Sequence, residues 1–254
     1  MVDVNVYDNI ISKDFRKEVW EYINNQKWCA MWKRVAPSPS TYYIPSEQKS
    51  LAGLDYRSVT QKLPTMWMHR SCFGSDDYTL ERDHPIIWKL WSMINQHLGN
   101  LYTLSGPQED MGTWEPPTPR DPYLEPGWRA YTNGQPDETL KRSHGVHRDT
   151  VDVNDDTTRT ILYVANLEWY PSWFGEVIFY PDDDKGLTGD YQQFQKDFGQ
   201  CRNFNIDWLD DGKIVSPVPG RIIDYDGRTL HTTRPTAIWS EGLRITIGFR
   251  ARKN

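Results

Sequence analysis

The second half of the chain is divided into short β-rich runs, and this division limits the possible folds most strongly. From residue 128 onward the runs WRAYT, HGVHRDT, RTILYVANL, GEVIFY, KIVSPV, GRIIDY and LRITIGFR are separated by Gly, Pro and Asp. Many short strands bounded by turn residues are typical of a sandwich, a jelly roll or a barrel. We therefore expect a mainly β protein, with one helix around residues 188–198 interrupting the strands.

Two helices are expected before these strands. Ser12 can cap the first, in which Phe15 and Val19 begin an apolar stripe at helical spacing, and the second has Pro85 in its first turn and Gly99 at its end. The polar and Pro-rich segments 33–50 and 105–128 are expected as long loops, either functional lids or connectors.

We expect one domain over residues 1–254. Residues 1–127 would supply a strand, supporting helices and Pro-rich loops, and residues 128–254 the β core with the functional site.

Charge and hydropathy argue against nucleic acids and membranes as partners. The formal net charge is −6 and no dense Lys/Arg run is present, so no nucleic-acid partner is expected. No apolar run approaches about 18 residues, and the N-terminus lacks the pattern of a signal peptide. We therefore expect a soluble protein of the cytoplasm or of another intracellular compartment, and no membrane partner.

The heptapeptide HGVHRDT, residues 144–150, contains candidate metal ligands. On a strand, residues two positions apart face the same side, so His147 and Asp149 would point together and His144 would lie on the other face. His231 follows an apolar strand and a tight Asp-Gly turn. Two histidines and one carboxylate form the facial triad that leaves positions open on non-haem Fe(II). A solvated polar edge remains the alternative.

The strand LRITIGFR offers an anchor for a cosubstrate. Iron of this type needs electrons, and a common source is 2-oxoglutarate, whose far carboxylate must be held by a fixed cation. Arg244 and Thr246 share one face of the strand, opposite an apolar face, and together they can bind a carboxylate. The alternative is a half-solvated strand with its polar side outward.

The order of these residues resembles the Fe(II)/2-oxoglutarate-dependent oxygenase superfamily, and most closely its prolyl 4-hydroxylase branch. The runs RAYTNGQ, WFGEVIFYP and PVPGRIIDYDGRTLH are similar to motifs of that family, and the resemblance covers about residues 128–250. It implies a double-stranded β-helix, or jelly roll, in which His147, Asp149 and His231 bind Fe(II) and also form the catalytic centre with O2.

The same resemblance implies that Arg244 binds the C5 carboxylate of 2-oxoglutarate, with Thr246 and Tyr131 as helpers. The sequence departs from the family pattern at Phe174, which replaces one glycine of a Gly-Gly pair, and in a longer spacing from the distal histidine to Arg244. Tyr163 would face the cofactor only in one of two strand registers.

The activity implied is hydroxylation of a C–H bond, most closely that of a prolyl residue in a peptide or protein. The same chemistry on a small molecule or a free amino acid is an alternative that the sequence leaves open. An alternative of another class is a non-catalytic β-sandwich binding domain with incidental histidines.

Overall fold

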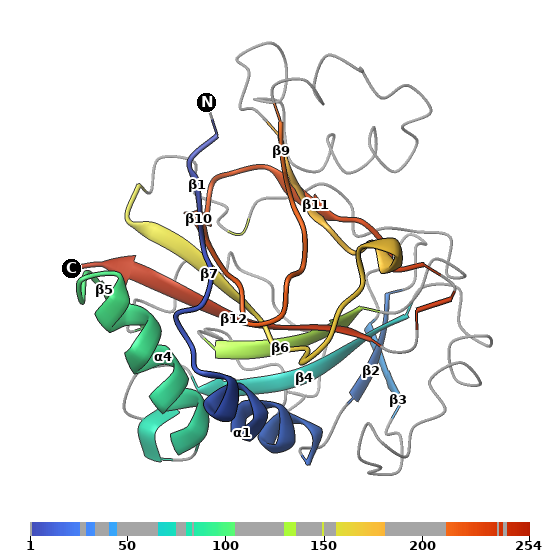
Figure 1. The fold of residues 1–254 in the computed structure, drawn as a ribbon, viewed down its shortest axis with the longest axis horizontal. Helices are drawn as coiled ribbons and strands as arrows, with labels where there is room; N and C mark the ends of the chain where they lie inside the picture. The colour runs from blue at the N-terminus through green and yellow to red at the C-terminus, as the bar shows by residue number, and fades with distance from the viewer. Residues whose placement is uncertain are drawn as a thin grey trace.

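In the residues that it describes, the computed structural model contains two antiparallel sheets and two main helices (Figure 1). It describes residues 2–25, 29–33, 41–44, 66–74, 80–82, 84–104, 130–135, 149, 156–180, 212–237, 239–240 and 243–254. The N-terminal half contributes β1 (Val4–Tyr7), α1 (Lys13–Asn24), β2 (Cys29–Lys33), β3 (Thr41–Ile44), β4 (Met66–Gly74), α4 (Pro85–His97) and β5 (Tyr102–Thr103). The C-terminal half contributes β6 (Ala130–Gln135), β7 (Thr158–Val164), the 3-10 helix η4 (Pro171–Trp173), β8 (Val177–Phe179), β9 (Lys213–Val215), β10 (Ile222–Asp226), β11 (His231–Thr233) and β12 (Arg244–Lys253).

The larger sheet has nine strands, and every pair in it is antiparallel. Its order is β1-β10-β7-β12-β6-β4-β2-β3, and β5 pairs with β12. The smaller sheet has the order β11-β8-β9. The strands β6 to β10 and β12 overlap six of the seven β-rich runs, so the prediction of a mainly β protein is confirmed. Of the seventh run, HGVHRDT, only Asp149 is among the described residues, and it lies in no strand. The helix expected around residues 188–198 lies outside the described residues.

Five strands, β2, β3, β4, β5 and β11, lie where the sequence analysis expected no strand. β2, β4 and β3 extend the larger sheet beyond β6, and β3 lies inside the segment 33–50 that was expected as a loop. That expectation was wrong because prolines on both sides hid a four-residue run of strand-favouring Thr, Tyr and Ile. An edge strand gains its stability from backbone pairing and needs no long alternating pattern.

The two predicted helices are confirmed, and they lie together on one side of the larger sheet (Figure 1). The Ser12 hydroxyl accepts a hydrogen bond from the Phe15 amide at 3.3 Å and caps α1, while Pro85 occupies the first turn of α4. The Tyr22 hydroxyl lies 2.6 Å from Nδ1 of His84, which connects the two helices. In the part of the chain that the structure describes, neither helix is long and apolar enough to cross a membrane.

The central strands separate two apolar clusters, one on each face. The helix-facing cluster joins the helices to alternate residues of three strands, namely Ile161 and Tyr163 of β7, Ile222 of β10, and Ile245, Ile247, Phe249 and Ala251 of β12. The inner cluster joins Leu162, Ile223 and Tyr225 to Val177, Phe179 and Val215 of the smaller sheet. The inner face of the larger sheet is the one that packs against the smaller sheet. A site between the two sheets would therefore be lined by side chains of this face.

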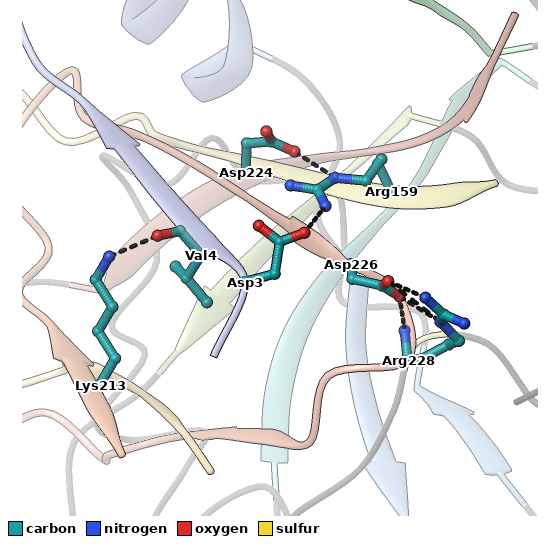
Figure 2. A network of polar contacts seen from close by, with 7 residues as sticks. All are labelled: Asp3, Val4, Arg159, Lys213, Asp224, Asp226 and Arg228. Atoms are coloured by element: carbon teal, nitrogen blue, oxygen red, sulfur yellow. Dashed lines mark hydrogen bonds and ion pairs between the residues drawn. The ribbon is translucent and has the colours of Figure 1, made fainter. Parts of the chain in front are cut away.

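A polar network fastens the N-terminal strand to the sheet (Figure 2). The Arg159 guanidinium donates to the buried carboxylate of Asp224 at 2.9 Å and also to Asp3. Burial alone would lower the pKa of Arg159, but the hydrogen bonds to Asp224 and Asp3 outweigh it and raise the pKa. Lys213 donates to the backbone carbonyl of Val4, so the network links β1, β7, β9 and β10.

Candidate functional site

Asp149 and His231 are brought together from segments far apart in the sequence. The backbone amide of Asp149 donates to the carbonyl of Gly227 at 2.9 Å, which fixes residue 149 against the turn after β10. His231 begins β11 on the smaller sheet. Nε2 of His231 lies 3.8 Å from Oδ2 of Asp149, and both side chains are buried. A nitrogen and a carboxylate oxygen thus face each other between the sheets.

The hydrogen bond at Nδ1 of His231 determines which ring nitrogen carries the proton. Nδ1 lies 2.9 Å from the carbonyl oxygen of Thr229, and because a carbonyl only accepts, Nδ1 carries the proton. In the neutral ring Nε2 then keeps its lone pair, and Nε2 is the atom that faces Asp149. A backbone carbonyl that fixes the tautomer in this way is a common partner of metal-binding histidines.

The separation of the two atoms is compatible with a shared divalent ion after a small closure. Two ligands at right angles on an ion with bonds of about 2.1 Å lie about 3.0 Å apart, so the observed 3.8 Å requires a movement of about 0.8 Å. Among the described residues, no three His, Cys, Asp or Glu side chains are gathered around one point. The proposed third ligand, His147, lies outside the described residues, as does His144.

Both oxygens of the Asp149 carboxylate have partners. The Tyr225 hydroxyl donates to Oδ2 at 2.7 Å, and a terminal nitrogen of Arg250 lies 3.1 Å from Oδ1. The Tyr225 hydroxyl also lies 3.3 Å from Nε2 of His231. These contacts determine how the carboxylate is oriented toward the histidine.

The inner face of β12 carries buried polar side chains. The predicted alternation is confirmed, since Ile245 and Ile247 belong to the helix-facing cluster while Arg244 and Thr246 lie on the other face. That face is not solvated: Arg244 is 4% exposed and Thr246 is 3% exposed. The alternative of a strand with its polar side in solvent is therefore wrong.

The guanidinium of Arg244 is buried. Burial lowers the pKa of the guanidinium to about 10, while the acidic groups of Tyr225 and Glu176 act in the opposite direction. A buried cation of this kind is costly unless an anion or several acceptors surround it. Because a guanidinium can bind a carboxylate through two parallel hydrogen bonds, the chemistry of this buried side chain fits the role predicted for it.

Phe174 and Gly175 stand where the sequence motif has a Gly-Gly pair, and the structure explains why glycine is favoured at both positions. Phe174 has a φ of 59° and Gly175 a φ of 83°, so both positions adopt conformations that favour glycine. A Cβ on Gly175 would lie 2.9 Å from Cδ of Arg244 and 3.3 Å from side-chain atoms of Thr236 and Trp169. Gly175 therefore leaves the room that the Arg244 side chain occupies.

The sequence analysis considered a role at the cofactor for two tyrosines, Tyr163 and Tyr131, and the structure bears on them differently. Tyr163 belongs to the helix-facing cluster and faces away from Arg244 and Thr246, and burial raises the pKa of its phenol. The register places Tyr131 of β6 opposite Gly248, but only the backbone of this strand is described. The role predicted for Tyr131 therefore stays a prediction.

Sequence reasoning missed Tyr225, Arg250 and the role of Gly175. Arg250 continues the alternation of β12 on the face of Arg244, so extending that pattern by a few positions would have found it. Tyr225 lies on the face of β10 that carries Ile223, and the residue pattern alone does not show that this face is turned toward His231.

No protein-family model and no curated protein matches the sequence, but solved structures match the fold. A prolyl hydroxylase from Trichoplax adhaerens, solved with a peptide fragment of the hypoxia inducible factor oxygen degradation domain, matches with a TM-score of 0.51 at 13% identity, over 100% of this chain and 84% of that chain. A Pseudomonas putida prolyl 4-hydroxylase matches with a TM-score of 0.44 at 10% identity, over 100% of this chain and 94% of that one. The alpha-ketoglutarate-dependent epimerase SnoN from nogalamycin biosynthesis matches with a TM-score of 0.47 at 12% identity, over 99% and 79%. The first of these matches shows that the chain shares the fold of that prolyl hydroxylase.

Proposed function

We propose that this chain is an Fe(II)- and 2-oxoglutarate-dependent dioxygenase that hydroxylates a C–H bond. The carrying observation is the pair of Asp149 and His231, whose oxygen and nitrogen face each other at 3.8 Å in a buried site between two sheets. With His147 they would complete a two-histidine, one-carboxylate set, which suits Fe(II) and leaves positions for O2 and 2-oxoglutarate. The bound iron would supply the oxidising chemistry.

The chain's own residues would hold the reactants in place. His231 is oriented by the carbonyl of Thr229, and Asp149 by Tyr225 and Arg250. Arg244 would bind the C5 carboxylate of 2-oxoglutarate, with Thr246 and Tyr131 as helpers. Three observations support this role for Arg244: its burial, its position on the inner face of β12, and the space that Gly175 leaves for it.

The architecture that we infer is a single domain built on a double-stranded β-helix, the jelly roll of this superfamily. Two antiparallel sheets with an apolar and polar interior between them support it. The helices α1 and α4 cover the outer face of the larger sheet.

For the substrate we propose a prolyl residue in a peptide or protein. The support is the resemblance of the motifs and the shared fold of a prolyl hydroxylase that was solved with a peptide. A small molecule or a free amino acid is the alternative, and the two are separated by measuring succinate release with proline-containing peptides and with free amino acids.

The experiment that tests the site measures the binding of 2-oxoglutarate and the binding of Fe(II) separately. Arg244→Ala should raise the dissociation constant for 2-oxoglutarate far more than that for Fe(II), both measured by anaerobic calorimetry. Arg252→Ala, on the same strand and the same face, is the matched control and should leave both constants unchanged. If Arg244→Ala changes both equally, or neither, Arg244 is not the anchor. If the wild type binds neither Fe(II) nor 2-oxoglutarate, the chain is a binding domain without this chemistry.

A further inference from the structure

The Tyr225 hydroxyl touches both atoms that face each other in the proposed metal site. It donates to Oδ2 of Asp149 at 2.7 Å and lies 3.3 Å from Nε2 of His231. Tyr225 is 1% exposed and lies on β10 of the larger sheet, whereas His231 lies on β11 of the smaller sheet. A single buried hydroxyl therefore reaches the carboxylate and the imidazole together.

The Tyr225 ring is surrounded mainly by other rings and apolar side chains among the described residues. The Tyr225 ring packs against Phe179 and against His231, in each case with ring centroids 4.9 Å apart, and it belongs to the apolar inner cluster. A phenylalanine would fill the same volume. Placing a hydroxyl in such a cluster is unfavourable unless it is hydrogen-bonded, so its contact with Asp149 accounts for the tyrosine.

The two oxygens of Asp149 are held by different groups. Arg250 contacts Oδ1 at 3.1 Å, and Tyr225 contacts Oδ2, the oxygen nearer to Nε2 of His231. A carboxylate held at both ends cannot rotate freely about its last bond. It would then present Oδ2 to an ion beside His231, while Arg250 keeps Oδ1 turned away.

We propose that Tyr225 is a positioning residue of the metal site, which acts by fixing the Asp149 carboxylate through its hydroxyl. This inference rests on the proposed function, because it assumes that Asp149 and His231 bind a divalent ion. Tyr225 itself does not ligate the ion in this account. Residues that orient metal-binding carboxylates and histidines typically contribute about 10–100-fold to metal affinity.

The test compares two tyrosine-to-phenylalanine variants. Tyr225→Phe should weaken Co(II) binding by about 10–100-fold and change the visible d–d absorption of the bound Co(II), which reports ligand geometry. Tyr163→Phe removes the hydroxyl of an equally buried tyrosine in the helix-facing cluster, and it should leave both the affinity and the spectrum unchanged. A merely structural hydroxyl would alter stability without moving the Co(II) spectrum.

The outcomes distinguish this inference from the proposed function. If the wild type does not bind the metal, the proposed function fails. If the wild type binds it and Tyr225→Phe binds it with the same affinity and spectrum, only the role of Tyr225 is overturned. A visible phenolate-to-metal charge-transfer band with Fe(III), absent in Tyr225→Phe, would show direct ligation and would also overturn the positioning role.

A second measurement keeps the inference testable if Tyr225→Phe does not fold. With 3-fluorotyrosine incorporated, the ¹⁹F resonance of residue 225 should shift when diamagnetic Zn(II) is added to the wild-type fold. The resonance of residue 163 should not shift, and Asp149→Ala should remove the response at residue 225. A resonance at 225 that is indifferent to Zn(II), in a protein that binds Zn(II), would overturn the inference.

Discussion

Substitution of Gly175 by alanine tests how the Arg244 pocket is built. Two separate penalties are expected. The backbone of Gly175 has a φ of 83°, and holding a residue with a Cβ in this region costs about 1–2 kcal/mol. The added Cβ would also lie 2.9 Å from Cδ of Arg244 and 3.3 Å from Thr236 and Trp169, and such overpacking costs about 1–3 kcal/mol. Gly175→Ala should therefore lower the free energy of unfolding by about 2–5 kcal/mol.

Gly99 provides a matched control for the backbone penalty. It has a φ of 78°, and an added Cβ would meet only Leu101, at an ordinary contact distance of 3.7 Å. Gly99→Ala should thus cost about 1–2 kcal/mol, without the packing penalty. Urea unfolding followed by tryptophan fluorescence measures both variants. If Gly175→Ala costs no more than Gly99→Ala, the close approach of Gly175 to Arg244 does not constrain the pocket, and the argument from space is refuted.

The remaining predictions use the same urea-unfolding measurement. Arg159→Met should cost about 3–5 kcal/mol because it leaves the buried Asp224 carboxylate without its cation, whereas Asp3→Asn, at an exposed side chain, should cost less than about 1 kcal/mol; similar costs for the two would contradict the network in Figure 2. At residue 174, with its φ of 59°, the glycine variant should be more stable than the alanine variant by about 1–2 kcal/mol, the reverse of the usual order, and a more stable alanine variant would show that the backbone there is not strained. Asn166→Ala should cost about 2–4 kcal/mol, because the Asn166 side chain donates to the carbonyl of residue 243 and accepts from the amide of residue 245; a loss below about 0.5 kcal/mol would mean that these groups find other partners.

The helices and central strands could be predicted because their patterns are local. The stripe that begins at Phe15 and Val19 repeats at helical spacing, and the β12 run alternates between Arg244, Ile245, Thr246 and Ile247. Each pattern follows from which face of an element is buried, and a single burial preference along an element is visible in its own residues.

The features that were missed depend on contacts between distant segments. β3 is a short edge strand whose pairing with β2 leaves no periodic signature. Tyr225 fits the alternating pattern of its strand. Its hydroxyl lies beside Asp149 and His231 only because of how β10 pairs with β7 and where β11 lies, and neither is visible in the sequence. For Tyr163 the sequence left two registers open, and the structure places it on the helix-facing side.

The central claim is most directly tested by anaerobic titration of the purified protein with Fe(II) and then with 2-oxoglutarate. Chelation of the keto acid by iron should produce a weak metal-to-ligand charge-transfer band in the visible range. The account predicts that this band appears in the wild type and is lost in His231→Ala and in Asp149→Ala. A folded, metal-loaded wild type without the band would contradict the account, and so would a band that survives the removal of His231.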